Sequence, residues 1–497
     1  MHALCPKAPR FDKVQFNVVL TLLSLLIISA CTTNPATGER QFTGLMSEDK
    51  ENQVGSQQHP QILASFGGEY NNAKLQNYMT QIGQRVSRDT ERPDVDYKFF
   101  LLDTPVLNAF AVPGGYIYAT RGLMAAANSE AELAAVLAHE VAHITGRHSA
   151  ERYSRGVLTS LGATVAAAAI GSPAVSRAIG IGANLYTSSY SRGQESEADK
   201  LGVRYLQQSG YDTQAMAGFL GQLEAESNLQ NQIEGRTTST APSFFSTHPN
   251  TAGRVVTAAQ IASTYPENSN DVGRDRYLKM IDGMTYGDSD KHGFVRGQTF
   301  YHPELGFTFT VPKHYRITNQ PSQILATTDT GAALILDIRE NKSRWTPAEY
   351  IMNVWMKDGI DIPPAQNIKI NGMNAATTAF DGIVNGKDVT LRLIALQYDS
   401  GAMYRFQVAI PKNLPQAMQE DLRRATYSFR RMTASERRNI KAQRVKVVVA
   451  RSGDTIQSLA NRMNFDTLKL ERFMALNGLK RNDKIVSGQR YKIVVKG

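Results

Sequence analysis

The apolar positions of this chain repeat with helical spacing in its first half and alternate as in strands further on. An apolar stripe predicts a helix over residues 74–86, and an alanine- and leucine-rich run predicts another from Ser129 to Gly146. Strands are expected at 97–102 and 116–120, the second directly after the turn signal Pro113-Gly114-Gly115. The strand at 116–120 could accept an extended peptide by edge pairing, although ordinary sheet pairing explains the same pattern.

Beyond about residue 270 the pattern predicts a second region of mixed strands and helices. Asn385-Gly386 and Ser400-Gly401 are expected as hairpin turns between its last three strands. The strands are expected at 307–311, 333–338, 376–383, 389–397 and 403–410, and the helices at 347–356 and 414–426. The last fifty residues predict a strand, two helices and a strand. The fold class is therefore α+β: a mainly helical domain with a small sheet, an α+β domain and a small βααβ domain.

The first thirty residues have the features of an export signal. A basic stretch from Lys7 to Lys13 precedes an apolar run over residues 18–28, which is too short for a comfortable membrane span. The run ends in Ile28-Ser29-Ala30-Cys31, which resembles a bacterial lipobox. We expect lipidation of Cys31, with an ordinary signal peptide or a short anchor helix as the alternative. Since Cys5 would be removed, no cysteine would remain for disulfides or metal binding.

The residue after the cysteine and the charge distribution indicate where the protein is placed. Thr32, rather than Asp, follows Cys31, which in enterobacterial-type sorting indicates the outer membrane. The chain carries a formal net charge of +10, and residues 441–497 contain thirteen Lys and Arg against four Asp and Glu. An anionic partner is expected for this C-terminal module, and outside the cytoplasm the cell wall is favoured over nucleic acid.

The predicted helix from Ser129 to Gly146 contains the sequence His139-Glu140-Val141-Ala142-His143. Histidines four residues apart leave one helix face about one turn apart, so both imidazoles can bind the same Zn²⁺. Two such histidines also occur by chance on helices. Here the apolar surroundings would bury them, and unpaired buried histidines are costly. We predict one zinc ion per chain, with Glu140 as the general base.

A second helix, predicted to begin after Ser191 and to end near Gly210, supplies a third ligand. Glu195 and Asp199 are four residues apart and share a face of this helix. Glu195 completes a His₂Glu site with an open fourth position, and Asp199 is expected to hold the other ring nitrogen of a zinc histidine. Glu197 points elsewhere and is expected to be solvated. A row of surface charges is the alternative explanation.

These motifs resemble peptidase family M48, in particular its soluble, lipoprotein-type bacterial members. The resemblance covers roughly residues 34–262 and rests on HExxH, the later ExxAD helix and the preceding Asn-Ala-Phe-Ala-x-Pro-Gly-Gly strand. It implies that the metal ligands are His139, His143 and Glu195, that the base is Glu140 and that Asp199 supports a ligand. It also implies that His248 and Arg254 lie near the zinc. There both could stabilise the oxyanion, or the histidine could occupy the open coordination position.

The C-terminal residues resemble a LysM domain, on the turn Gly453-Asp454-Thr455, the sequence Asn477-Gly478-Leu479 and the exit strand from Gly488. Such domains bind glycans that contain N-acetylglucosamine, so peptidoglycan is implied as a partner. We expect the module to localise the protein without a part in catalysis, with a plain structural cap as the alternative. The α+β domain before it loosely resembles Mog1/PsbP-type folds and is interpreted as a binding or spacer module.

Composition shifts divide the chain into segments. An Ala/Gly-rich stretch over 156–185 is interpreted as a helical hairpin or lid, with two structural helices as the alternative. The expected segments are a signal peptide (1–30), a tether (31–58), a zincin-type metallopeptidase domain (59–265), a linker (266–298), an α+β domain (299–433), a linker (434–444) and a LysM-like domain (445–497).

The combined expectation is a zinc metalloendopeptidase that is lipid-anchored to the outer membrane on its periplasmic side. The resemblance implies that its substrates are misfolded or stalled envelope proteins, in particular outer-membrane proteins. The alternative is a peptidoglycan-bound scaffold or chaperone-like lipoprotein with a latched or inactive protease site. The complete set of ligands and base argues against lost activity, because a vestigial site would be expected to lack one of them.

Overall fold

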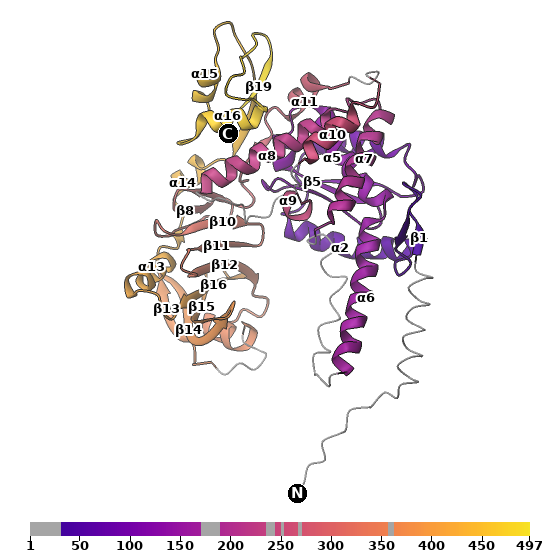
Figure 1. The fold of residues 1–497 in the computed structure, drawn as a ribbon. Coiled ribbons are helices and arrows are strands. Elements are labelled where there is room, and N and C mark those ends of the chain that lie inside the picture. The colour runs from indigo at the N-terminus through magenta and orange to yellow at the C-terminus, as the bar shows by residue number, and fades with distance from the viewer. Residues whose placement is uncertain (1–30, 170–188, 235–243, 250–252, 267–270, 356–361) are drawn as a thin grey trace. The chain divides into compact units, whose positions relative to one another are not determined.

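The computed structural model describes residues 31–169, 189–234, 244–249, 253–266, 271–355 and 362–497 (Figure 1). The expected signal peptide and residues 170–185 of the expected hairpin over 156–185 lie outside these residues. The described residues form two compact units. The first takes its residues from Met1–Ile62, Glu69–Met284 and Val445–Ile493, and the second from Leu63–Gly68, Thr285–Arg444 and Val494–Gly497. Within the described part, no helix is long and apolar enough to cross a membrane.

The structure confirms an α+β fold. Up to residue 281 the strands are β1 (Cys31–Thr33), β2 (Arg40–Phe42), β3 (Lys98–Leu102), β4 (Ala109–Val112) and β5 (Tyr116–Thr120). The helices there are α2 (Glu48–Ser65), α3 (Ala73–Ser87), α4 (Arg121–Ala126), α5 (Glu130–Thr145), α6 (His148–Ala169), α7 (Arg192–Gln208), α8 (Ala215–Glu234), α9 (Phe244–Thr247), α10 (Arg254–Ala262) and α11 (Arg274–Ile281). The helices and strands predicted over 74–86, 97–102, 116–120 and 129–146 are therefore confirmed.

Strand β5 lies in the middle of a three-stranded sheet. It pairs with β3 in parallel on one side and with β4 antiparallel on the other. The suggestion that residues 116–120 accept a peptide by edge pairing is therefore wrong, because both edges of β5 are occupied. Gly115, just before β5, has φ +87°, and a Cβ there would lie 2.4 Å from the backbone oxygen of Asp96. Only glycine fits this turn without displacing the neighbouring chain.

The segment expected as a tether is folded against the first unit. β1 and β2 form an antiparallel hairpin in which Cys31 is opposite Phe42. The side chain of Asn34 is buried, and its Oδ1 accepts the N–H of Ala36 at 2.9 Å, which fixes the turn after β1. The expected tether thus carries regular structure, and Cys31 lies within this hairpin.

Helix α5 is almost completely buried in the first unit. All of its residues except Glu132 are buried, and it packs against α3, α7 and α8; Figure 1 shows α5 and α7 side by side. The Ser129 hydroxyl accepts the N–H of Glu132 at 3.1 Å, and the Glu132 carboxylate accepts the N–H of Asn128 at 2.6 Å. This arrangement satisfies the first free amides of the helix much as a capping box does.

The second unit contains a seven-stranded antiparallel sheet in the order β10-β11-β12-β16-β15-β14-β13. The strands of this unit are β6 (Thr285–Tyr286), β7 (Phe294–Arg296), β8 (Thr299–His302), β9 (Phe307–Thr310), β10 (Arg316–Gln320), β11 (Gln323–Thr327), β12 (Ala333–Glu340), β13 (Gln366–Ile370), β14 (Met373–Val384), β15 (Lys387–Gln397), β16 (Ala402–Pro411) and β17 (Arg430–Arg431). The five predicted strands are confirmed. Sequence reasoning missed the polar strands at the two edges of the sheet, β10 and β13, because they lack a regular apolar alternation.

The helices of the second unit are α12 (Pro347–Tyr350), which continues as the π-helix η2 (Ile351–Trp355), α13 (Gln416–Tyr427) and α14 (Ala434–Asn439). The expected hairpin turn at Asn385-Gly386 is present, with both residues at positive φ. The segments expected as linkers carry regular structure: α11, β6 and β7 fall within 266–298, and α14 within 434–444.

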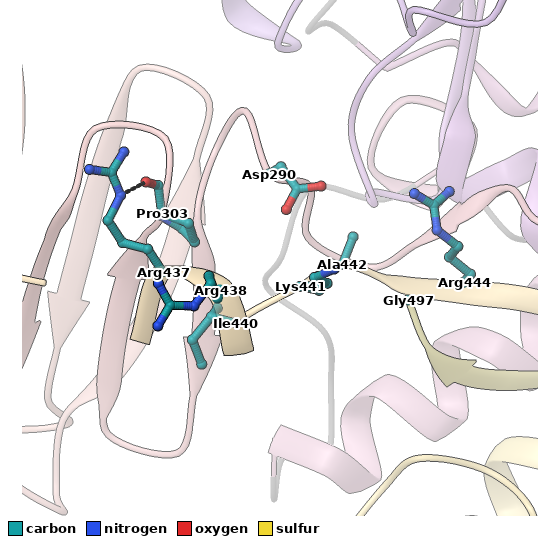
Figure 2. A pocket seen from close by; sticks show the side chains of 9 residues that line it. All are labelled: Asp290, Pro303, Arg437, Arg438, Ile440, Lys441, Ala442, Arg444 and Gly497. Atoms are coloured by element: carbon teal, nitrogen blue, oxygen red, sulfur yellow. Dashed lines mark hydrogen bonds between the residues drawn. The ribbon is translucent and has the colours of Figure 1, made fainter. Parts of the chain in front are cut away.

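A basic pocket of about 430 Å³ lies in the second unit (Figure 2). It is lined by Asp290, Pro303, Arg437, Arg438, Ile440, Lys441, Ala442, Arg444 and Gly497. The side chain of Arg437 links two segments of the second unit, because its Nε donates to the backbone oxygen of Pro303 at 2.8 Å.

The C-terminal module is part of the first unit. It consists of β18 (Gln443–Val449), α15 (Ile456–Asn461), α16 (Lys469–Asn477) and β19 (Arg490–Lys496), which confirms the predicted βααβ order. Helix α16 packs against α4 and α8, and the Gln222 amide on α8 donates to the backbone oxygen of Ala475 on α16. The side chain of Lys492 on β19 is fully buried and donates to three backbone oxygens at the end of α4. Those contacts measure 2.8, 3.1 and 2.8 Å, to residues 125, 126 and 127.

Lys492 therefore caps the C-terminus of α4, where the last carbonyls of a helix need donors and favour a cation. Burial lowers the pKa of Lys492, and the nearby carboxylates of Glu132 and Glu226 oppose this shift. The module is tied to the first unit through a charged group in its interior.

We predict that Lys492→Met lowers the free energy of unfolding of the first unit by at least about 2 kcal/mol, because three buried carbonyls lose their donor. Chemical denaturation of the full chain measures this change. Lys484→Met, at an exposed position of the same module, is the control and should leave the free energy of unfolding unchanged. Equal denaturation midpoints for the two variants would contradict the prediction.

Candidate metal centre

Two imidazoles from α5 converge on one point. The Nε2 atoms of His139 and His143 are 3.1 Å apart, and both rings are buried. The rings meet edge to face, with centroids 4.7 Å apart. This is the arrangement that four-residue spacing on a helix produces.

Helix α7 brings a carboxylate to the same point. Ser191 and Gln194 form a capping box that starts the helix, so Glu195 lies in its first turn. The Oε1 atom of Glu195 is 3.4 Å from Nε2 of His143, and its Oε2 atom is 3.6 Å from Nε2 of His139. The two helices can approach closely at Gly202, where a Cβ would lie 3.3 Å from the backbone nitrogen of His139.

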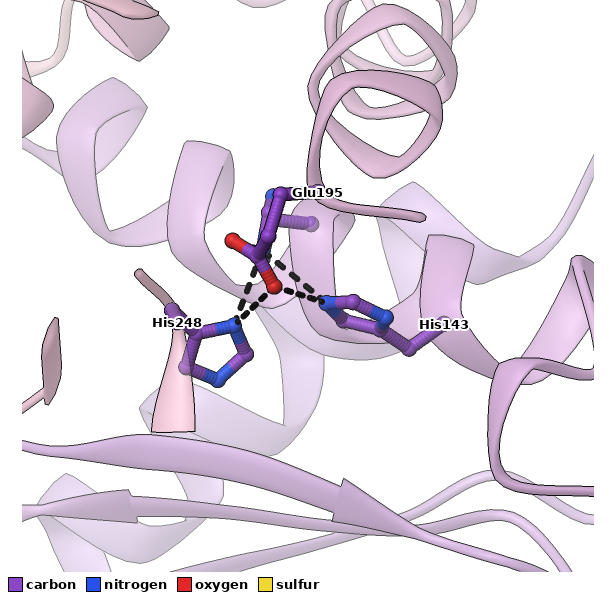
Figure 3. Close-up of side chains that lie close together, drawn as sticks. His143, Glu195 and His248 are labelled. Atoms are coloured by element: carbon purple, nitrogen blue, oxygen red, sulfur yellow. Dashed lines mark hydrogen bonds and ion pairs between the residues drawn. The ribbon is translucent and has the colours of Figure 1, made fainter. Parts of the chain in front are cut away.

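His248 is the fourth member of this cluster and follows the short helix α9. Its Nδ1 atom is 3.0 Å from Oε1 of Glu195 and 3.3 Å from Nε2 of His139. Figure 3 shows the imidazoles of His248 and His143 on either side of the Glu195 carboxylate. One possible ligand atom from each of His139, His143, Glu195 and His248 lies within 4.8 Å of the other three.

Glu140 lies beside the cluster and is fully buried. Burial raises the pKa of its carboxyl group, and the nearby His248 and His139 oppose the shift. Its Oε1 atom is 3.4 Å from Nε2 of His248. Among the described residues, none forms a hydrogen bond of good geometry with either carboxylate oxygen. The carboxylate of Glu140 is thus a stronger base than an exposed one, and its oxygens are available to accept a proton from water.

Asp199 lies behind His139, as the sequence analysis expected. Its Oδ1 atom is 3.1 Å from Nδ1 of His139, the ring nitrogen that faces away from the cluster. Burial lowers the pKa of His139, but the carboxylates of Asp199 and Glu195 outweigh this effect and raise that pKa to about 10.

Arg254 lies beside the cluster and contacts two of its carboxylates. Its Nε and Nη2 atoms donate to the two oxygens of Asp199, both at 2.8 Å, and Nη1 is 2.8 Å from Oε2 of Glu195. A guanidinium that is shared between two buried carboxylates orients them and has few donors left for a substrate. These contacts favour a role of Arg254 in orienting Asp199 and Glu195, and the oxyanion role expected for it stays a prediction.

Sequence reasoning missed three residues next to the cluster. The ring of Tyr190 stacks on that of His143, with centroids 3.7 Å apart and planes 14° apart. The Nδ1 atom of His148 lies 2.8 Å from Nδ1 of His143. Glu197, expected to be solvated, is 3.4 Å from Nε2 of His148 and is three-quarters buried. For His148 the sequence offered one local signal, its position directly after the turn Gly146-Arg147. For Tyr190 the sequence offered no signal of a place near the cluster.

The residues at this site fit a zinc ion. Lone-pair-bearing nitrogens and carboxylate oxygens face one another at a buried point, where such groups repel unless a cation lies between them. Among the described residues, Oε2 of Glu195 and Nε2 of His248 form no hydrogen bond of good geometry, although each has a charged neighbour. Two or three imidazoles with one carboxylate are a typical set of zinc ligands.

The sequence comparisons agree with this geometry. The model of peptidase family M48 matches residues 73–262, and the LysM domain model matches residues 448–493. Residues 73–262 form a peptidase family M48 domain. The M48 domain thus contains all six of His139, Glu140, His143, Glu195, Asp199 and His248, and also Arg254.

Relatives of the M48 domain include named peptidases. The beta-barrel assembly-enhancing protease of Yersinia pestis is 31% identical over 259 residues, which is 47% of this chain and 50% of that protein. The mitochondrial metalloendopeptidase OMA1 of Schizosaccharomyces pombe is 26% identical over 227 residues, or 44% of this chain and 63% of that protein. The chain thus spans half of the length of the first of these proteins and 63% of the second.

One solved structure matches about a quarter of this chain. The yeast Ran-binding protein Mog1p matches with a TM-score of 0.21 at 12% identity, over 26% of this chain and 92% of that chain. This score supports no argument, so the Mog1/PsbP-type resemblance stays a prediction.

Proposed function

We propose that this chain is a zinc-dependent metalloendopeptidase. The observation that carries the proposal is the convergence of His139, His143 and Glu195 on one buried point with the carboxylate of Glu140 beside it. These three side chains would hold the metal, one zinc ion per chain. A zinc ion bound there would act as a Lewis acid that activates water and polarises the scissile carbonyl.

Glu140 would carry the protons. Its raised pKa suits a group that takes a proton from the attacking water at one oxygen and passes it to the leaving amine. Nε2 of His248, a potential hydrogen-bond donor, lies 3.4 Å from Oε1 of Glu140. When its Nε2 is protonated, His248 could donate to the oxyanion of the tetrahedral intermediate.

The substrate would bind along β4 rather than β5. β4 is one of the two edge strands of its sheet, and it packs against α5. An extended peptide added there would lie next to the metal helix and would be held by main-chain hydrogen bonds. Recognition of this kind depends little on side chains, which fits unfolded substrates.

The relatives and the sequence signals support an envelope role. Relatives of this chain are named beta-barrel assembly-enhancing proteases, and the sequence that ends at Cys31 resembles a lipobox. We propose misfolded or stalled outer-membrane proteins as substrates, a lipid anchor at Cys31 and a periplasmic location at the outer membrane. We also propose that the LysM domain binds peptidoglycan, since its loops over 451–455 and 480–489 are largely exposed.

The second candidate is a scaffold or chaperone-like protein with a latched protease site. The observation in its favour is the position of His248, whose Nδ1 lies 3.0 Å from Glu195 and 3.3 Å from His139. A third imidazole at this point, as a fourth ligand beside His139, His143 and Glu195, would occupy the position that water and substrate need. The two candidates differ in what removal of His248 does.

We predict that Glu140→Gln keeps about one zinc per chain but lowers the cleavage rate of unfolded casein by 10²-fold or more, because an amide cannot accept the proton. His143→Ala should lose both the zinc and the activity. Elemental analysis and a cleavage assay with and without chelator measure both quantities. Full activity in Glu140→Gln, or unchanged zinc in His143→Ala, would overturn the proposed function.

Replacement of His248 by Ala decides between the two candidates. If His248 stabilises the oxyanion, as we propose, His248→Ala should cleave casein about 10²-fold more slowly than wild type. The assay uses full-length protein with its zinc content measured in parallel. Faster cleavage by the variant would mean that His248 is a latch, and the second candidate would then be favoured.

Cys31→Ser should release the protein from the membrane fraction, because we propose the lipid on Cys31 as the anchor. The released protein should still sediment with isolated peptidoglycan through its intact LysM domain. Fractionation of cells and a sedimentation assay check the two outcomes. Cys5→Ser is the matched control and should stay with the membranes; a Cys31→Ser variant that also stays there would show another anchor.

A further inference from the structure

We infer that His148 positions the metal ligand His143, and that Glu197 and Asn34 hold His148 in place. This inference rests on the proposed zinc site. It extends that site from the cluster to the hairpin that begins at Cys31. The residues next to the proposed lipid anchor would then contribute to the affinity of the metal centre.

The turn between α5 and α6 brings His148 back onto His143. Arg147 adopts a left-handed conformation with φ 52°, which is uncommon for a residue other than glycine. Its side chain holds this conformation, since Nε donates to Oε1 of Glu51 at 2.8 Å and Nη2 donates to the Met46 oxygen at 2.7 Å. A Cβ at Gly146 would lie 2.7 Å from Nε2 of His148. Both residues of the turn are thus required for the placement of the second imidazole.

The orientation of the rings determines which nitrogens carry protons. Nε2 of His143 faces His139 and Glu195, at 3.1 and 3.4 Å, so it is the atom that points into the cluster. A neutral histidine that binds a metal through Nε2 carries its proton on Nδ1. Nδ1 of His143 would therefore donate to Nδ1 of His148, 2.8 Å away. His148 is the acceptor that selects this tautomer.

The same reasoning places a proton on the far side of His148. Since its Nδ1 accepts, its Nε2 carries the proton and faces Oε1 of Glu197 at 3.4 Å, a long contact. Oε1 of Glu197 also accepts from Nδ2 of Asn34 at 2.7 Å. The amide of Asn34 cannot turn over, because its Oδ1 already accepts the N–H of Ala36. The series of contacts runs from His143 through His148 and Glu197 to Asn34.

The ring of His143 is held on its face as well as at its edge. Tyr190 stacks on it, and its own hydroxyl lies 3.2 Å from Oγ of Ser149, the residue after His148. Arg152, one turn further along α6, lies 4.1 Å above the ring of Tyr190. The first turn of α6 therefore supports His143 from two directions, while α5 supplies only the backbone position.

The test is the zinc dissociation constant of the full-length protein, measured by competition with a chelator of known affinity. His148→Phe keeps a ring of similar size but removes the acceptor, and it should weaken zinc binding by about 10–100-fold. His148→Asn places an oxygen near the former Nδ1 and should restore most of the affinity. Equal dissociation constants for wild type and His148→Phe would overturn the inference.

A second pair of variants tests the outer contacts and also applies if His148→Phe does not fold. Glu197→Leu should weaken zinc binding by about tenfold, while Glu197→Gln, which can still accept from both neighbours, should stay close to wild type. Glu224→Leu, at an exposed carboxylate on α8, is the control and should change nothing. Identical constants for Glu197→Leu and Glu224→Leu would overturn the outer part of the inference.

A ring-nitrogen NMR spectrum of histidine-labelled protein supplies a readout that is independent of activity. Nδ1 of His143 should give the signal of a protonated nitrogen in wild type, and this signal should shift or broaden in His148→Phe. The experiment also separates the two proposals. No zinc on wild type would overturn the proposed function and this inference together, whereas zinc on wild type with unchanged variants would overturn the inference alone.

Discussion

The burial of α5 is the constraint on which the rest of the first unit depends. A helix that is buried on all sides and carries ionisable groups must find a partner for each of them inside the protein. Glu130 at its start receives two hydrogen bonds from Arg276, at 2.6 and 2.8 Å, and one each from Tyr78 and Tyr211. These donors outweigh burial and lower the pKa of Glu130. Further along the helix, Nδ1 of His139 has Oδ1 of Asp199 as its partner at 3.1 Å, and Nδ1 of His143 has Nδ1 of His148 at 2.8 Å.

The same constraint explains why the LysM domain belongs to the first unit. Glu132 on α5 and Glu226 on α8 are raised in pKa by burial, and Lys492 of the LysM domain is the cation that opposes both shifts. Lys492 also satisfies the last carbonyls of α4, the helix that directly precedes α5. Loss of Lys492 would remove this cation from both carboxylates and the donor from the carbonyls of α4. The expectation of a module that only localises the protein is therefore too simple, and the structural-cap alternative has a concrete basis.

The sequence predicts those parts of the site in which the interacting residues lie close together along the chain. His139, Glu140 and His143 are fixed relative to one another by a single helix, so their spacing suffices. Glu195 and Asp199 come from a second helix, and the spacing within it gives their common face but not their partner. Arg254 was placed by resemblance near the oxyanion, and its pairing with Asp199 could not be derived, because it depends on how α10 packs against α7.

Two further residues of the site could not be placed from the sequence: His148 depends on the backbone of a turn, and Asn34 lies in a hairpin far away in the sequence. His148 reaches His143 only because Arg147 takes a left-handed conformation, which no periodicity reveals. Asn34 reaches Glu197 across 163 positions of the sequence. The polarity of both residues was visible, but a polar residue beside a turn is usually solvated. Their burial is a property of the packed hairpin and could not be read from the local pattern.

The charges at the metal centre form one balanced set. Glu140, Glu195 and Asp199 bring three negative charges to a buried region, and Arg254 brings one positive charge. A divalent cation would neutralise the remainder with all imidazoles uncharged, which is the protonation state that ligands require. Without a cation the balance must come from protons, and the raised pKa of His139 is the expected consequence. The fit of these residues to zinc therefore rests on charge as well as on geometry, and the positive charge of Arg254 is part of that balance.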